Sequence, residues 1–189
     1  MFKSFYCWQS WSIVAFVSFL FSACCFFQRP QDGGVIGQVV GREVVFQRLL
    51  SFNIPDRMSL GSLLESSEYS VVIYVDSSSC EDCGITFALN TRGFELELKQ
   101  KQREDIPFIY IFNTQDVWTL QSRLREMGFH HYYFVDFENT FLEKNEIPAN
   151  KLFHTFLLKN NKIHLIGNPS TNQKVRKLYN KILRVSTRS

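Results

Sequence analysis

The fold is decided by the stretch Val71-Val-Ile-Tyr-Val-Asp76, which is followed by three serines and by Cys80-Glu-Asp-Cys83. The first of these segments is mainly apolar and β-branched, which predicts a buried strand. Serines are typical turn and N-cap residues, and beyond them Phe87, Phe94 and Leu98 recur at near-helical spacing. The pattern predicts a strand, a short turn and a helix that starts at Cys80, with Cys83 in its first turn.

Cys80 and Cys83 are candidate catalytic residues because a three-residue offset on a helix brings both sulfurs to one side, close enough to bond. The backbone N–H groups at a helix start favour a thiolate and lower a cysteine pKa from about 8.5. Glu81 and Asp82 act in the opposite direction, because nearby negative charges disfavour a second anion. The balance predicts a modestly lowered pKa and a reductant or low-potential exchange role.

The composition suits one globular domain preceded by a targeting segment. The chain has 189 residues, of which 45% are hydrophobic, enough for a substantial core. Its formal net charge is +3, with no long run of either sign. We therefore expect no nucleic-acid partner, which would normally show as a basic stripe.

The N-terminal region predicts export. Lys3 is the only charged residue before Arg29, and an apolar stretch of signal-peptide length lies between them. Leu20-Phe-Ser-Ala-Cys24 resembles the lipobox of bacterial lipoproteins, in which the cysteine is lipidated. This resemblance implies a signal peptide over 1–23, lipid attachment at Cys24, a lipidated tether over 24–42 and a globular domain over 43–185. The protein would then be anchored to a lipid bilayer in the cell envelope, facing the periplasm. The alternative is an uncleaved transmembrane anchor from Phe5 to Phe27.

Export makes the cysteine count informative. Cys7 would leave with the signal peptide, Cys24 would carry lipid, and Cys25 would be an adjacent passenger or a second acylation site. Only Cys80 and Cys83 then remain in the globular part. An exported domain with one close pair is not a disulfide-stapled scaffold, so the pair is expected to be functional.

The rest of the chain alternates strand and helix patterns. We expect a short edge strand over 44–46, a short helix over 60–64, the central strand over 71–75 and a long helix over 81–103. We then expect a strand over 106–112, a helix from a Thr114 cap to Met127 and a strand over 132–135. The chain should end with a hairpin of 153–158 and 162–166 around Asn160-Asn161 and an amphipathic helix over 172–183, with Val175, Leu178, Tyr179 and Ile182 on one face. This order predicts an α/β sandwich with a mixed sheet.

The order of elements and the position of the Cys-x-x-Cys pair resemble the thioredoxin fold over residues 43–185. Tyr74-Val-Asp-Ser77, the cysteine pair, His154-Thr-Phe-Leu-Leu158 and Gly167-Asn-Pro169 are similar to the TlpA/ResA and peroxiredoxin-like lineages and to thioredoxin-like lipoproteins of Gram-negative bacteria. The resemblance implies a thioredoxin-like three-layer sandwich with a central mixed sheet, a thiol–disulfide oxidoreductase that needs no cofactor, and protein thiols or disulfides as partners.

Carried over residue by residue, the resemblance makes Cys80 the attacking thiol and Cys83 the resolving thiol. His154 falls at the position of the family's cis-proline, with Thr155 after it. Ser79 replaces a large residue, and Glu-Asp replaces the usual pair between the cysteines. The missing proline bears on substrate docking, since that backbone lines the family's groove.

His154, Thr155 and Asp76 are the candidate supporting residues. His154 would stabilise a thiolate as imidazolium or steer proton transfer, or is simply tolerated at its position. Asp76 would cap the loop or serve as a proton acceptor.

Two other function classes remain open at this point. One is a redox-inactive thioredoxin-like binding module. The other is a metal carrier, in which Cys80, Cys83 and His154 would bind copper. We expect no metal site, because there is no second cysteine pair and the histidines lack paired helical spacing.

Overall fold

The computed structural model describes residues 37–54, 58–76, 81–100 and 106–185, all within one compact unit, Ile36–Ser189. The predicted signal peptide, Cys24, the tether up to residue 36 and Cys80 lie outside the described residues, as do residues 101–105 at the end of the expected long helix. In the parts of the chain that the structure describes, every helix is too short or too polar to cross a bilayer.

The described residues form a mixed sheet whose spatial strand order is β1-β4-β3-β2-β5-β6. The strands are β1 (Leu50–Phe52), β2 (Tyr69–Asp76), β3 (Phe108–Asn113), β4 (Tyr133–Val135), β5 (Thr155–Lys159) and β6 (Lys162–Ile166). Strands β2, β3 and β4 run parallel, whereas β1, β5 and β6 pair antiparallel to their neighbours. The predicted central strand is thus confirmed as the middle of the sheet.

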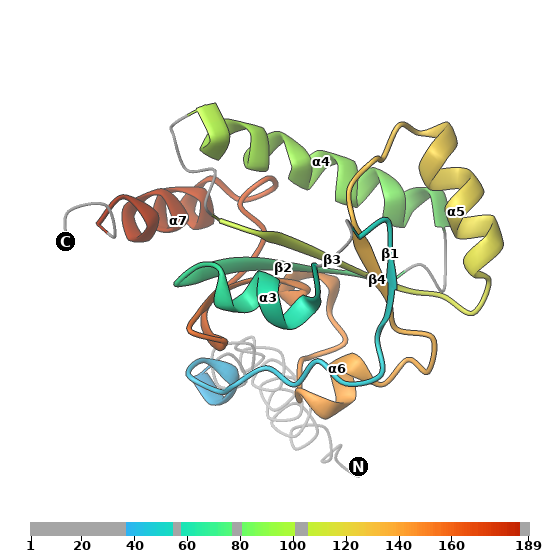
Figure 1. Cartoon of the computed structure of the whole chain (residues 1–189). Coiled ribbons are helices and arrows are strands. Elements are labelled where there is room, and N and C mark those ends of the chain that lie inside the picture. Colours follow the sequence, from blue (N-terminus) through green and yellow to red (C-terminus); the bar gives the residue numbers. More distant parts are fainter. Residues whose placement is uncertain (1–36, 55–57, 77–80, 101–105, 186–189) are drawn as a thin grey trace, which may run out of the picture. The chain divides into compact units, whose positions relative to one another are not determined.

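Helices cover both faces of this sheet (Figure 1). Helices α4 (Glu81–Gln100), α5 (Val117–Glu126) and α7 (Gln173–Val185) pack on one face, and α3 (Leu60–Glu65) and α6 (Phe141–Lys144) on the other. The prediction of a three-layer α/β sandwich is therefore confirmed.

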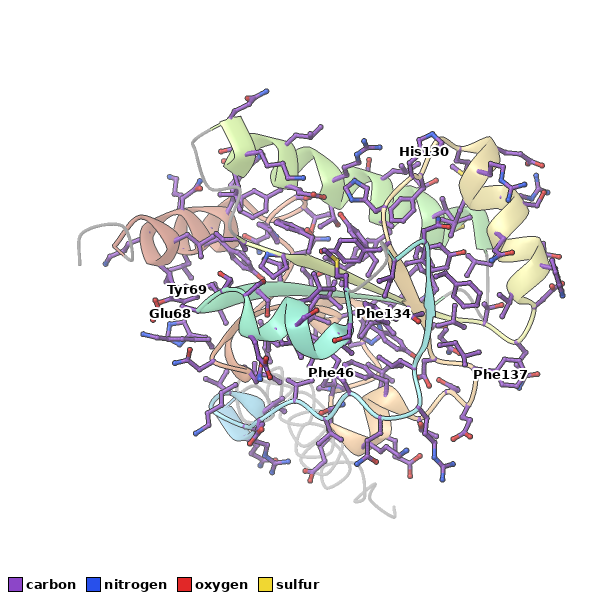
Figure 2. All side chains as sticks on the ribbon, in the orientation of Figure 1. Phe46, Glu68, Tyr69, His130, Phe134 and Phe137 are labelled. Carbon is purple, nitrogen blue, oxygen red and sulfur yellow. The ribbon has the colours of Figure 1, made fainter. Side chains whose placement is uncertain are left out.

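Strand β2 is buried on both sides, which explains its continuous apolar sequence. Successive side chains of a strand point to opposite faces. Val71, Ile73 and Val75 accordingly join the core beneath α4, and Val72 and Tyr74 join the core beneath α3 and α6. Phe134 contributes to the second core from β4, and Phe46 packs against it (Figure 2).

The predicted edge strand over 44–46 is wrong. Glu43 makes an isolated bridge to Lys162, and the first strand of the sheet comes later, at β1. The Asn145 side chain accepts a hydrogen bond from Val45 N–H (2.7 Å) and donates one to Val45 C=O (3.0 Å). The Asn145 side chain thus satisfies the backbone of Val45, whereas Val44 N–H donates to the Asn161 carbonyl of the hairpin at 2.9 Å.

Helix α5 begins later than predicted. Asp116, and not Thr114, is the N-cap, and its carboxylate accepts hydrogen bonds from the backbone N–H and the hydroxyl of Thr119. The helix ends at Glu126, and Gly128 then adopts φ +70°, a left-handed conformation that glycine tolerates without strain.

The C-terminal hairpin matches its prediction at the turn. Asn160 and Asn161 both have positive φ, as a two-residue hairpin turn requires. Strand β5 starts at Thr155, because the 3₁₀ helix η1 (Lys151–Phe153) precedes it. In α7, Tyr179 is buried as predicted, but Leu178 is 46% exposed and does not belong to the buried face.

Candidate active site

Cys83 occupies the predicted place in the fold. Helix α4 begins at Glu81, so Cys83 lies in its first turn, next to the edge of the sheet where β2 ends at Asp76. Its side chain is exposed, and it is disulfide-bonded. Cys80, the other candidate catalytic residue, lies outside the described residues.

Strand β5 brings a distant segment to the same edge. It pairs antiparallel with β2, placing Thr155 opposite Ile73. One step further, Tyr74 N–H donates a hydrogen bond to the His154 carbonyl at 2.8 Å. The ladder thus places His154 at the carboxyl end of β2. All peptide bonds of the described residues are trans, including those around His154.

These elements enclose a pocket of about 160 Å³. It is lined from β2, from the first turns of α4 and from the segment before β5. The lining residues are Tyr74, Val75, Asp76, Cys83, Gly84, Phe87, Lys151 and His154. Three of the predicted site residues, Cys83, Asp76 and His154, therefore meet at one pocket.

The His154 ring is buried and held on two sides. Its Nε2 lies 3.2 Å from the Pro148 carbonyl, and its plane is edge-on to the Tyr74 ring at 5.3 Å between centroids. Because a carbonyl can only accept, Nε2 carries the hydrogen of this bond. Burial lowers the pKa of His154 below its ordinary value of 6.5, and Asp76 only partly offsets this. Near neutral pH the ring is therefore uncharged, which does not favour the predicted imidazolium role.

Lys151 is a lining residue that the sequence did not indicate. Its ammonium lies 3.7 Å from Asp76 Oδ2, and both side chains are partly exposed, by 58% and 22%. Asp76 thus faces a cation at the pocket. No local pattern shows this, because Lys151 and Asp76 meet only through the pairing of β2 with β5.

The second acidic residue near the sulfur has a cationic neighbour as well. Asp82 Oδ1 lies 3.9 Å from Arg123 Nε of α5, and Arg123 also contacts Glu126 at 3.2 Å. Both members of the Asp82–Arg123 pair are largely exposed, so solvent screens their attraction. This pair only partly offsets the negative charge that the sequence places beside the cysteines.

Thr155 does not line the pocket. It is fully buried in β5, and its hydroxyl oxygen has no hydrogen-bond partner among the residues that the structure describes. Its backbone carbonyl accepts a hydrogen bond from Gly167 N–H at 2.7 Å. The contribution of Thr155 is therefore to position the start of β5, next to His154.

Behind the pocket, the Tyr74 side chain joins a buried polar network. Its hydroxyl lies 3.2 Å from Asn139 Oδ1 and 3.4 Å from Asp136 Oδ2. Asp136 also accepts hydrogen bonds from the backbone N–H groups of Thr140 and Phe141. Burial and the neighbouring aspartates raise the pKa of Tyr74 well above its ordinary value, so the hydroxyl stays protonated and remains a donor.

A second polar cluster lies further along α4, around the buried Glu95. Its carboxylate contacts Lys99 Nζ at 2.8 Å and His131 Nε2 at 3.8 Å, and it accepts a hydrogen bond from the Tyr110 hydroxyl at 3.1 Å. Burial and the Glu95 charge raise the pKa of Tyr110 well above its ordinary value. We call these four residues the Glu95 cluster; the sequence did not indicate it.

A larger pocket, of about 290 Å³, lies between β4, α5 and the end of β1. Its lining residues are Asn53, Gln121, Leu124, Arg125, Phe129, His130 and Tyr133, with no thiol among them. Within the described ranges, no three histidine, cysteine, aspartate or glutamate side chains are grouped to hold a metal ion. The pocket beside Cys83 is therefore the candidate active site.

The chain has a thioredoxin-like fold. Its mixed sheet lies between two helical layers, and a disulfide-bonded cysteine lies at the start of the helix that follows the central strand. The chain matches no protein-family model and no curated protein.

Solved structures provide the comparison. The chain is similar to a provisionally assigned thiol:disulfide interchange protein DsbE from Chlorobium tepidum, with a TM-score of 0.51 and 12% identity over 77% of this chain and 96% of that chain. It also matches the thioredoxin domain of a thiol-disulfide oxidoreductase from Bacteroides vulgatus, with a TM-score of 0.48 and 14% identity over 74% and 96% of the two chains. At such identities the likeness establishes the fold alone.

Proposed function

We propose that this chain is a thiol–disulfide oxidoreductase of the cell envelope that exchanges disulfides with partner proteins. The observation that carries the proposal is Cys83, an exposed, disulfide-bonded cysteine in the first turn of α4 beside a pocket. A disulfide in that position is accessible to the thiolate of a partner. The name of the Chlorobium tepidum protein is consistent with this class of reaction.

Cys80 is the proposed partner of Cys83 in the disulfide and the attacking thiol of the reduced form. Its thiolate attacks a disulfide of the partner protein, forming a mixed disulfide, and the second partner sulfur leaves as a thiolate that takes a proton. The Cys83 thiolate then attacks the Cys80 sulfur and releases the remaining partner sulfur. The partner gains two electrons, and the Cys80–Cys83 disulfide forms.

The charges at the site support a reductant or low-potential role. Asp76 lines the same pocket as Cys83, and Asp82 is its neighbour in α4. Two carboxylates close to the sulfurs disfavour a thiolate, so the reduced form is not unusually stabilised. A strong oxidant requires the opposite arrangement.

The chain without residues 1–23 should show a reversible two-electron couple at roughly −300 to −180 mV, measured by equilibration with glutathione or dithiothreitol. Cys83→Ser should abolish the couple, because no internal disulfide can then form. Thr86→Ser, an exposed position one turn along α4, is the matched control and should leave the couple unchanged. A wild-type protein without a measurable couple contradicts the proposal.

The membrane location belongs to the same proposal and rests on the lipobox-like segment that ends at Cys24. Lipid at Cys24 would anchor the domain to a bilayer through the tether over 24–42. Cys24→Ala should abolish incorporation of labelled fatty acid, whereas Cys25→Ala should retain it. Unchanged labelling of Cys24→Ala contradicts the lipid anchor without affecting the exchange chemistry.

A further inference from the structure

Lys151 and Asp76 form an ion pair at the pocket that Cys83 also lines. We propose that Lys151 is a positioning residue for the sulfur chemistry: its ammonium group redistributes from Asp76 toward the thiolate that forms when the Cys83 disulfide opens, and it thereby favours the reduced form. This inference rests on the exchange activity proposed above. It assigns to η1 an electrostatic role at the reacting sulfurs.

The sulfur, the carboxylate and the ammonium border one small pocket. Cys83, Asp76 and Lys151 all line it, and its volume is about 160 Å³. Charges that line so small a space interact appreciably, and they are screened less than charges on an open surface. We therefore expect the Lys151 ammonium to act on a charge on the Cys83 sulfur, which borders the same pocket.

The Lys151–Asp76 pair is loose enough to respond to a new charge. At 3.7 Å the two groups are not in close hydrogen-bond contact, and the Lys151 side chain is 58% exposed. A lysine ammonium is a point charge on a flexible stem, so it can be shared between two anions without a change in the backbone.

Other cationic groups near the sulfur are less suited to this role. His154 is uncharged near neutral pH, and its Nε2 is committed to the Pro148 carbonyl. Arg123 of α5 lies between Asp82 and Glu126 and does not line the pocket. Lys151 is thus the only cation at neutral pH among the described residues that line this pocket.

Reduction changes the charge of the pocket. When dithiothreitol is the reductant, one of its thiolates attacks a sulfur of the Cys83 disulfide, and the other protein sulfur leaves as a thiolate. The second thiol of dithiothreitol loses its proton and closes the ring, which releases the remaining protein sulfur; this sulfur takes the proton. Two electrons pass to the protein. When the attack falls on the other sulfur of the disulfide, the new thiolate is that of Cys83, which lines the pocket with Asp76, and Lys151 offsets the repulsion.

The experiment compares Lys151→Gln with Lys159→Gln. Both lysines are partly exposed and both are paired with a carboxylate, but Lys159 contacts Glu68 at 3.1 Å at the other end of β5. Figure 2 shows Glu68 and Tyr69 at the end of β2 that is far from Phe137, which lies two residues after the end of β4. The two variants therefore remove the same charge at opposite ends of one strand pair.

In Lys151→Gln, the lower thiol pKa of the reduced protein, followed by the ultraviolet absorbance of the thiolate, should rise by about 0.5 to 1. At a pH above this pKa, where the thiol is ionised, the equilibrium with glutathione should shift toward the disulfide by roughly three- to tenfold, since a pKa change of one there corresponds to a tenfold change in the equilibrium. Lys159→Gln should change neither quantity. Lys151→Arg should restore both, and Asp76→Asn should shift both in the opposite direction.

If Lys151→Gln has the same thiol pKa and the same equilibrium with glutathione as the wild type, the inference is overturned, but the proposed exchange activity is not. If Lys151→Gln does not fold, Lys151→Ala decides by the same two measurements: a wild-type thiol pKa overturns the inference, and a raised one supports it. A wild-type protein without a reversible couple removes the proposed function and this inference together.

Discussion

Helix α4 carries two polar clusters whose charges are held very differently. Around Glu95, the carboxylate is buried and contacts Lys99 and Tyr110 at 2.8 and 3.1 Å. Around Cys83, the Lys151–Asp76 pair is 3.7 Å long and partly exposed. A buried, fully bonded charge is costly to disturb, whereas a loose pair can respond to a charge that forms nearby. Helix α4 thus borders a buried, tightly bonded cluster at Glu95 and a looser, partly exposed ion pair near Cys83.

The largest expected effect is on stability, from Glu95→Ala. This substitution removes the acceptor of the Tyr110 hydroxyl and the partner of Lys99, so we expect the free energy of unfolding to fall by about 3 kcal/mol. Lys151→Gln should cost less than about 1 kcal/mol, because the Lys151 side chain is 58% exposed and its pair with Asp76 is 3.7 Å long. Urea unfolding of the oxidised proteins measures both. Equal losses would contradict the contrast between the clusters.

A smaller effect isolates one bond of the Glu95 cluster. Tyr110→Phe deletes the hydroxyl that donates to Glu95 and should lower the free energy of unfolding by about 1 to 2 kcal/mol, since the acceptor is charged. Tyr179→Phe is the matched control, because the buried Tyr179 hydroxyl has no hydrogen-bond partner among the described residues. Removing it should be neutral or stabilising. A loss in Tyr179→Phe as large as in Tyr110→Phe would show that ring packing, and not the bond, matters.

The smallest effect is a pH dependence to which both clusters contribute a histidine. Burial lowers the pKa of both His131 and His154 below the ordinary value of 6.5. As the pH falls through 6.5, the histidines of the unfolded chain therefore become protonated before those of the native protein, and the free energy of unfolding decreases. We expect each histidine to contribute about 0.5 to 1 kcal/mol between pH 7.5 and 5.5.

Urea unfolding across this pH range tests the histidine contributions. His154→Phe and His131→Phe should each reduce the slope of stability against pH, whereas replacement of the exposed His164 by Phe should leave it unchanged. An unaltered slope in His154→Phe would mean that the ring takes up its proton in the native state as readily as in the unfolded chain. That result would reopen the imidazolium role at the pocket.

Local patterns were sufficient to predict most of the sheet and its helices. The apolar run of β2, the Asn160-Asn161 turn and the place of Cys83 in the first turn of α4 are each decided by neighbours in the sequence. The expected strand over 44–46 failed because Asn145, far along the chain, satisfies the backbone of Val45. β-branched residues favour an extended chain but do not specify its partner.

The residues that surround the site depend on tertiary contacts, so the sequence could not indicate them. In α4, Glu95 turns inward and is 4% exposed, while the adjacent Leu96 turns outward and is 48% exposed. Hydropathy predicts the reverse for both. Lys151 reaches Asp76 only because β5 pairs with β2, a contact that no short motif records.

The pairing of β2 with β5 also has a consequence for biosynthesis. Cys83 and helix α4, which carries it, leave the ribosome about 70 residues before His154 and the η1 segment that complete the pocket. Contacts between such distant segments form late in folding, after the loop between them has closed. A truncated chain that ends before η1 would therefore lack Lys151 and His154, and the pocket beside Cys83 would be complete only once β5 pairs with β2.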